Sequence, residues 1–440
     1  MKKLSFQKIF CFISFLFILS CCIFYGTRFI KLYLENEKEL EVEANTLAKV
    51  IRDNNIENDN YKNVNDNEYF INNSENNYLK YSNIIWRIVK VNPDNSITVI
   101  SDNSLTSLAY GEYLDYLNSF PFKWLNHNDN EEYSGILEKN LNNKETYLQK
   151  TIACLDTMDT LNNENCKNTN QDSYISLLSV PDYINIGNKD SYVINNENFY
   201  LNNSNTQNEI WYVNDEASIT TSKGTDVIGI KPVITIKSNI DFISGDGSKE
   251  NPYIIEKEQG LFGSYVKLEN DIWQIYQVNE TDVRLVLNDY LKTNDTELKH
   301  IYSNINSYHN DTKAGSLAHY LNNTFLNTLS YKDKINETTW SNGYYGSSTQ
   351  YNYKEAIENT IETKVALISI TDIRLNSTLE NYFTLTSTKE KGSMVYTINS
   401  SQKIYGKNIQ NELNVVPAIS LNKDLLTKGN GTFESPYEME

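Results

Sequence analysis

The chain has 440 residues, 57 of them acidic against 39 Lys and Arg, which gives a formal net charge of −18. A chain of this length exceeds what one hydrophobic core normally organises, so two domains of ordinary size are expected. The negative charge argues against nucleic-acid binding by the folded part. Aromatic residues make up 12% of the chain, too much for disorder, so the Asn-rich stretches are predicted to be loops between ordered strands.

An uncharged apolar run occupies residues 9–27, close to the ~20 residues that a membrane-spanning helix needs. Three lysines precede the run and acidic residues follow it, so the positive-inside bias makes residues 1–8 a cytoplasmic stub. The sequence therefore predicts a single-pass membrane protein whose C-terminal bulk is extracellular. A cleaved signal peptide, or a lipoprotein signal at Cys21, is the alternative.

Residues 28–75 follow the apolar run and comprise a helical stretch and then a polar run. Apolar residues recur at helical spacing as far as residue 55, and Asn and Asp dominate from Asn54 to Asn67. The pattern predicts a juxtamembrane helix followed by a flexible polar spacer.

Two cysteines lie outside the apolar run, Cys154 and Cys166. In an oxidising compartment such a pair favours a disulfide that closes a short loop, the alternative being two free thiols. Their spacing differs from a CxxC redox motif, and no His lies nearby to complete a zinc site. No metal or cofactor is predicted.

A long internal repeat organises the remainder. The segment YLKYSNIIWRIVKVNPDNSITVI from Tyr78 matches YVKLENDIWQIYQVNETDVRLVL from Tyr265, and later segments match in the same order. These correspondences predict two tandem modules, residues 76–257 and 258–440. Each reads as an opening β-hairpin, a middle region with one or two helices and a late set of short strands, which is an α+β class dominated by strands.

Each predicted module ends on one motif, GDGSKENPY in the first and GNGTFESPY in the second. The charged positions change between the copies, whereas residues that bend the backbone or bury a ring recur. The motif is therefore predicted to be a closing turn and final short strand, not a ligand loop. Its recurring residues are Gly245, Gly247, Ser248, Pro252, Tyr253, Gly429, Gly431, Thr432, Pro436 and Tyr437.

Several short motifs carry a family resemblance. An early Trp-Arg-Ile-Val, a Trp-Leu-Asn helix, a Leu-Leu-Ser strand and a late IGIKPVI resemble an uncharacterised extracytoplasmic domain of low-GC Gram-positive bacteria. That domain is similar to the formylglycine-generating-enzyme and C-type-lectin-like folds. The resemblance implies a tandem C-type-lectin-like architecture but no activity, because this scaffold hosts oxidases, sugar binders and inert modules. The second copy departs more, with Val416 in place of Lys231.

Catalytic and metal-binding interpretations are weak. Formylglycine-type chemistry needs an active-site cysteine pair, for which a disulfide is the simpler account. The residues Trp211, Asn214 and Asp215 resemble a calcium-ligand motif, but a single Asn-Asp pair favours a hairpin turn instead. The recurring Ser-x-x-Asp pairs are predicted to cap helices or turns. They are Ser179 with Asp182 and Ser369 with Asp372.

Aromatic residues in Asn-rich loops are candidates for contact with sugars. The loop NFYLNNSNTQN from Asn198, and a second stretch around residues 344–353, combine aromatic rings with amides. Trp86 and Trp273 lie on predicted strands and are expected in the core instead. The candidates for ligand binding are Tyr344, Tyr345, Tyr351, Tyr353, Trp211, Asn214 and Asp215.

These patterns predict a membrane-anchored surface protein that serves recognition or cell-surface structure without catalysis. The expected partners are the lipid bilayer and an envelope glycan or surface protein, and not nucleic acid. One alternative is an envelope glycan hydrolase that uses two carboxylates of one module, spaced about 5 to 9 Å apart. The other alternative is a subunit associated with a pilus or with secretion.

Overall fold

The computed structural model describes residues 24–28, 31, 46–55, 61–71, 76–111, 114–130, 134–161, 166–187, 192–193, 197–304, 313–342, 360–375, 378–388, 393–399 and 403–439. The predicted span at 9–27 lies outside these residues except for its last four, which are helical. Within the described part, no helix combines the length and apolarity needed to cross a membrane.

Strands dominate both halves of the molecule, as the predicted α+β class requires. The first half, up to residue 257, holds a nine-stranded and a five-stranded sheet. The larger sheet has the path β16-β3-β4-β5-β15-β10. In addition, β2 pairs with β4, β1 pairs with β2, and β7 pairs with β15. Its strands are β1 (Tyr61–Val64), β2 (Asn67–Phe70), β3 (Tyr78–Tyr81), β4 (Ile84–Val91), β5 (Ile97–Ser101), β7 (Leu148–Gln149), β10 (Ile175–Leu177), β15 (Pro232–Ile236) and β16 (Tyr253–Ile254).

The smaller sheet of the first half has the order β13-β12-β11-β14-β6. Its strands are β6 (Thr106–Leu108), β11 (Phe199–Ser204), β12 (Ile210–Val213), β13 (Ile219–Ser222) and β14 (Ile228–Ile230). A separate pair joins β8 (Ala153–Cys154) to β9 (Thr169–Asn170). The helices are α2 (Leu47–Asn55), η1 (Tyr116–Asn118), α3 (Phe120–Leu125), η2 (Glu138–Asn140), α4 (Lys144–Tyr147) and α5 (Val180–Asn185).

The second half repeats this strand order. Its larger sheet follows β32-β17-β18-β19-β30-β25, with β31 beside β32, and its smaller sheet follows β28-β27-β26-β29-β22. The strands of the larger sheet are β17 (Tyr265–Leu268), β18 (Asp271–Val278), β19 (Asp282–Leu287), β25 (Val365–Leu367), β30 (Pro417–Asn422), β31 (Leu426–Lys428) and β32 (Tyr437–Met439). Those of the smaller sheet are β22 (Lys299–Ile301), β26 (Tyr382–Ser387), β27 (Met394–Ile398), β28 (Ile404–Asn408) and β29 (Glu412–Asn414).

The remaining elements of the second half are short. Two hairpins pair β20 (Lys292–Thr293) with β21 (Thr296–Glu297), and β23 (Thr338–Ser341) with β24 (Thr360–Thr363). The helical elements are α6 (Leu317–His319), the π-helix η4 (Tyr320–Phe325), α7 (Leu326–Thr328) and η5 (Lys423–Leu425).

An asparagine at the end of α3 and one within η4 make the same contacts to a strand in the two halves. Asn126 donates from Nδ2 to the carbonyl of Ile175 over 2.9 Å and accepts the amide of Ile175 at Oδ1 over 3.2 Å. Asn322 makes the same two bonds to Val365, over 2.9 and 3.0 Å. Both bonds fix the first residue of a buried strand, so each Leu-Asn pair is explained by sheet geometry.

The GxG motifs are turns that require glycine. Gly247 and Gly431 have φ of 82° and 79°, and a Cβ on either would lie 2.4 or 2.6 Å from the ring of Tyr253 or Tyr437. Each tyrosine begins a short strand that runs parallel to the first strand of the repeated segment, β16 beside β3 and β32 beside β17. The motif therefore joins the end of each half to its beginning.

The described residues between 46 and 71, from the segment predicted to hold a juxtamembrane helix and a polar spacer, are part of the first half. Leu47, Ala48 and Ile51 of α2 are buried in its core, and β2 pairs with β4 through Glu68 and Tyr69. The prediction of a flexible spacer is therefore wrong for residues 61–67. The Asn and Asp residues supply a tight turn with positive φ, while aromatic residues between them pack inward.

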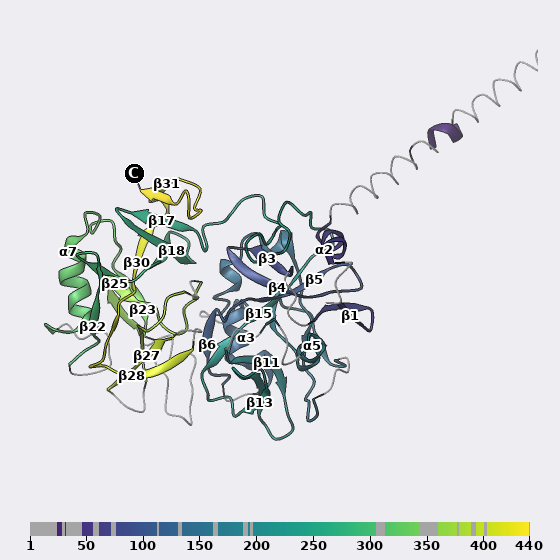
Figure 1. Ribbon diagram of the computed structural model, residues 1–440, viewed down its shortest axis with the longest axis horizontal. Coiled ribbons are helices and arrows are strands. Elements are labelled where there is room, and N and C mark those ends of the chain that lie inside the picture. Colours follow the sequence, from purple (N-terminus) through teal and green to yellow (C-terminus); the bar gives the residue numbers. More distant parts are fainter. Residues whose placement is uncertain are drawn as a thin grey trace, which may run out of the picture.

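The halves meet along the segment that follows β25 (Figure 1). Arg374 donates its amide to the carbonyl of Leu105 over 2.7 Å, and Thr371 accepts the indole N–H of Trp124 over 2.9 Å. The side chain of Ile373 is buried in the core of the first half. This segment of the second half thus packs against the first half and forms hydrogen bonds with it.

Candidate functional site

The hairpin of β12 and β13 carries a shallow pocket of about 530 Å³, which we call the Trp211 pocket. Trp211 lies directly opposite Thr221 in the register of the two strands, so both side chains face the same side of the sheet. The volume falls in the range of about 300–1,000 Å³ that is usual for small-molecule sites. The lining residues are Asp159, Asn205, Thr206, Gln207, Glu209, Trp211, Ile219, Thr220 and Thr221.

The indole ring of Trp211 is half-buried and fixed in place. Its Nε1 donates to the carbonyl of Met158 over 2.8 Å, and the amide of Met158 in turn donates to the carbonyl of Ser204 over 2.8 Å. An anchored ring loses little conformational entropy when a ligand covers its face. The pocket therefore offers a preorganised aromatic surface.

Polar groups from the loop between β11 and β12 form the rim. Asn205 Oδ1 accepts the amides of Gln207 and Glu209 over 3.0 and 2.9 Å, which shapes the loop. Glu209 Oε2 accepts from Thr221 Oγ1 over 2.8 Å and from Asn205 Nδ2 over 3.3 Å. The carboxylate of Glu209 thus joins the loop to the strand that carries the pocket floor.

Asp159 completes the rim from another segment. Its Oδ1 accepts the backbone amide of Thr206 over 2.7 Å. Hydrogen bonds from the backbone and the side chain of Thr206 hold the pKa of Asp159 below its usual value. The exposed carboxyl is therefore charged at neutral pH.

The Cys154–Cys166 pair closes the segment that carries Met158 and Asp159. The two sulfur atoms lie 2.05 Å apart, at disulfide distance. Asn203 Nδ2 ties the same segment to β11 by donating to the carbonyl of Asp156 over 3.0 Å. One side of the Trp211 pocket is therefore positioned by a covalent loop.

The corresponding face of the second half is covered. Tyr396 opposes Gly406 on β27 and β28, as Trp211 opposes Thr221 on β12 and β13. Tyr396 packs with Ile404 against a small cluster that includes Ala109 of the first half. Of these two equivalent hairpin faces, the one in the first half carries the open pocket.

A second depression, the sheet groove, crosses the larger sheet of the first half and has a volume of about 460 Å³. Asp182 lies in it and accepts from Lys90 Nζ over 2.8 Å, from the Tyr69 hydroxyl over 2.7 Å and from Ser179 Oγ over 2.8 Å. Burial would raise the pKa of Asp182, but the Lys90 charge and these hydrogen bonds lower it below its usual value. Lys90 and Asp182 thus form an ion pair within the groove.

Ser179 and Asp182 have the predicted capping geometry. Ser179 is the N-cap of α5 and its Oγ accepts the amide of Asp182 over 3.1 Å. In the second half the roles are reversed, because Asp372 Oδ2 accepts the amide of Ser369 over 2.7 Å. Burial raises the pKa of Asp372. Both pairs hold turns, in agreement with the structural interpretation.

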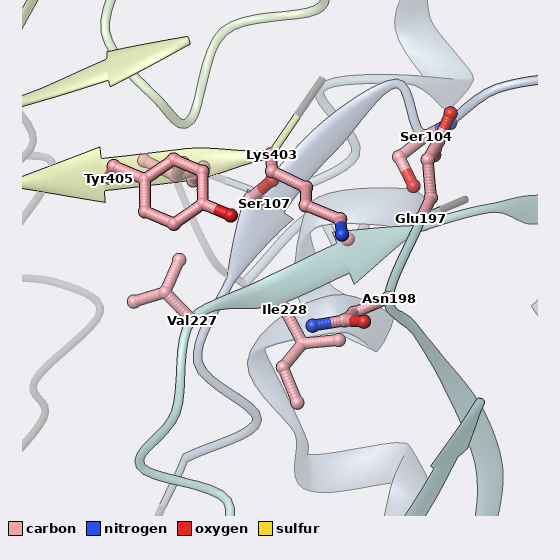
Figure 2. A pocket seen from close by; sticks show the side chains of 10 residues that line it. Ser104, Ser107, Glu197, Asn198, Val227, Ile228, Lys403 and Tyr405 are labelled. Carbon is pink, nitrogen blue, oxygen red and sulfur yellow. The ribbon is translucent and has the colours of Figure 1, made fainter. Parts of the chain in front are cut away.

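A third cavity, the junction pocket, lies between the halves and measures about 100 Å³. Figure 2 shows the Lys403 side chain of the second half reaching toward Glu197 and Asn198 of the first, with Tyr405 on the other side of the pocket beside Val227. Glu197 Oε2 accepts the amide of Ser104 over 2.7 Å, and Lys403 forms an ion pair with Asp215. The small volume and these internal contacts make it an interface void that can hold a few waters.

Asn214 and Asp215 belong to a hairpin turn. Asn214 Oδ1 accepts the amides of Glu216 and Ser218 over 3.1 and 2.8 Å, and Ala217 has a φ of 65°. The Lys403 side chain engages the Asp215 carboxylate and lowers its pKa. These contacts match the turn interpretation, and neither residue lines the Trp211 pocket.

Four tyrosines complete the set of ligand-binding candidates from the sequence. Tyr344, Tyr345, Tyr351 and Tyr353 lie outside the described residues. In the part of the chain that the structure describes, Cys154, Asp156 and Cys166 are the one group with metal-ligand proximity. The disulfide occupies both sulfurs, and Asp156 accepts the amides of Lys167 and Asn168 over 2.6 and 3.0 Å, which accounts for this group without a metal.

The sequence predicts Trp211 and the loop after β11 as candidates for ligand binding. It does not predict that Asp159 lies beside them. The composition of NFYLNNSNTQN was a usable signal, since Asn205, Thr206 and Gln207 line the pocket. Asp159 is separated from this loop by more than forty residues, and only the disulfide-closed segment brings it near. Comparison of the chain with protein-family models, with curated proteins and with solved structures gives no match.

Proposed function

We propose that this protein is a non-catalytic recognition protein that binds an envelope glycan through the Trp211 pocket. The observation that carries the proposal is a half-buried indole ring, fixed by its bond to Met158, among the residues that line an open polar pocket. The face of an indole is apolar and electron-rich, which suits the C–H groups on the face of a sugar ring. Amide, hydroxyl and carboxylate groups around it suit sugar hydroxyls.

The sheet groove supports a glycan hydrolase less well. Its carboxyls belong to Asp94 and Asp182, and a general acid needs a raised pKa. Burial would raise the pKa of Asp94, but hydrogen bonds from Ser96 lower it, and the pKa of Asp182 is also below its usual value. Among the described residues that line the groove, Tyr69 is the one with an aromatic ring, and it is buried and offers no open face to a sugar.

The cellular setting is part of the proposal. The apolar run at 9–27 and the charges on either side of it support a membrane anchor with the folded part outside the cell. A disulfide-distance pair at Cys154 and Cys166 is compatible with an oxidising compartment. Tandem modules at residues 76–257 and 258–440 are also part of the proposal, and the shared strand order of the two halves supports them. The proposed C-type-lectin-like architecture rests on the sequence motifs alone.

A binding experiment on the folded part tests the proposal. Residues 46–440 would be titrated with the β-1,4-linked N-acetylglucosamine tetramer and mixed with purified peptidoglycan in a sedimentation assay. We expect saturable binding that Trp211→Ala weakens at least about tenfold, as for loss of an aromatic anchor. Phe433→Ala, which removes an exposed ring from the second half, is the matched control.

Two results would overturn the proposal. One is the absence of binding to both probes by the folded wild-type protein. The other is binding that Trp211→Ala and Phe433→Ala leave equally intact, because the indole ring would then have no special role.

A further inference from the structure

The charged residues that line the Trp211 pocket are all acidic among the described residues. Asp159 and Glu209 line it, and no Lys, Arg or His stands among its described lining residues. Both carboxylates are held in position, Asp159 by the amide of Thr206 and Glu209 by the hydroxyl of Thr221. An anionic ligand would meet repulsion from these fixed charges.

From this arrangement we infer that the pocket prefers glycans that carry free amino groups. The inference rests on the proposed function and names its ligand class. A protonated amine on the sugar would be attracted by the two carboxylates, and also by the electron-rich face of Trp211. Neutral N-acetylated sugars would keep only the stacking and the neutral hydrogen bonds.

The geometry of Glu209 favours this role. Both hydrogen bonds that position it end on Oε2, from Thr221 Oγ1 and Asn205 Nδ2. The carboxylate is therefore oriented before a ligand arrives, and because both donors are neutral groups they leave its negative charge in place. Half-burial of Glu209 strengthens its electrostatic attraction relative to an exposed carboxylate.

The test compares glucosamine and N-acetylglucosamine oligomers of equal length and linkage, at a mildly acidic pH that keeps the amines protonated. We expect the amino oligomer to bind wild-type protein about tenfold more tightly at low salt, with the preference falling as salt screens the charges. The variant Asp159→Asn/Glu209→Gln retains the hydrogen-bond acceptors, and it should lose this preference while still binding the N-acetylated oligomer.

Glu216→Gln serves as the control for loss of a nearby negative charge, because Glu216 is an exposed acid of the adjacent turn that does not line the pocket. It should leave the preference unchanged. Equal binding of the two oligomers to wild-type protein would overturn the amino-glycan inference but leave glycan binding standing, as would an unchanged preference in the double variant. Failure of wild-type protein to bind either oligomer would overturn both proposals.

Discussion

At the scale of single residues, the glycines of the two GxG motifs show how strictly a position can be determined. Gly247 combines a φ of 82° with a Tyr253 ring 2.4 Å from where a Cβ would be. The sequence predicted this structural role because glycine and tyrosine recur while the charges change. The sequence could not reveal that the carbonyl of Gly247 accepts the amide of Tyr78 over 2.8 Å. This bond ties the closing turn of the repeated segment to its first strand.

Gly247→Ala should therefore lower the free energy of unfolding by about 1–3 kcal/mol, through strain at positive φ and displacement of the tyrosine ring. The measurement is urea unfolding followed by circular dichroism. Gly406→Ala is the control, because a Cβ there meets chiefly the flexible end of Met394. Equal stability of the two variants would contradict this account.

Asp182 gives a prediction of pH dependence. Its folded-state pKa is lowered, so the unfolded chain binds more protons as the pH falls from the usual aspartate value toward the folded pKa. Its contribution to stability is present above the unfolded pKa and is lost as the pH falls through the folded one. Asp182→Asn should lose about 1–3 kcal/mol at neutral pH, a range reduced because the side chain is 20% exposed.

The stability gap between wild type and Asp182→Asn should narrow as the pH falls below the usual aspartate pKa. Urea unfolding at neutral and at acidic pH measures it, with Glu216→Gln as a control that removes an exposed charge. A gap that stayed constant over this range would show that the ionised Asp182 is not what stabilises the fold.

At the scale of elements, strands with strong alternation were predictable and contacts of loops were not. The hairpin from Tyr78 was recognised by its apolar strands and its NPDN turn, and β3, β4 and β5 form there. The hairpin β1–β2 was missed because Asn and Asp dominate its sequence. Tyr69 and Phe70 are the buried residues that its polar composition concealed.

The disulfide-closed segment links stability to the candidate site. A double variant, Cys154→Ser/Cys166→Ser, should be less stable by about 3 kcal/mol, the loss expected for a loop of this size. It should also bind glycan more weakly, because Met158 and Asp159 would lose their fixed positions beside Trp211. Calorimetric titration below the melting temperature checks this, and a folded variant with unchanged affinity would contradict it.

At the scale of the whole molecule, the two halves share a strand order but differ in what their equivalent faces contact (Figure 1). The repeated segments made the common architecture predictable. The junction was not predictable, because it joins residues more than 240 positions apart, such as Trp124 and Thr371. No local pattern in the sequence marks which face of a module will be covered by its neighbour.

The junction predicts cooperative unfolding of the halves. Ile370 is fully buried between them, and its carbonyl accepts from Thr106 Oγ1 over 2.9 Å. Scanning calorimetry should show one transition for wild type, and two for Ile370→Asp because a charge in this position disrupts the contact. Ile243→Asp, at an exposed isoleucine, should keep one transition. Two transitions in wild-type protein would contradict a cooperative junction.

The most direct test of glycan recognition is a nitrogen-proton NMR titration that follows the indole signals, with Trp211 assigned by the signal missing from Trp211→Phe. Addition of the glucosamine oligomer should shift the Trp211 signal saturably. The signals of the buried Trp86, Trp124, Trp273 and Trp340 should stay in place. Saturable binding that left the Trp211 signal unmoved would contradict the assignment of the glycan site to this pocket.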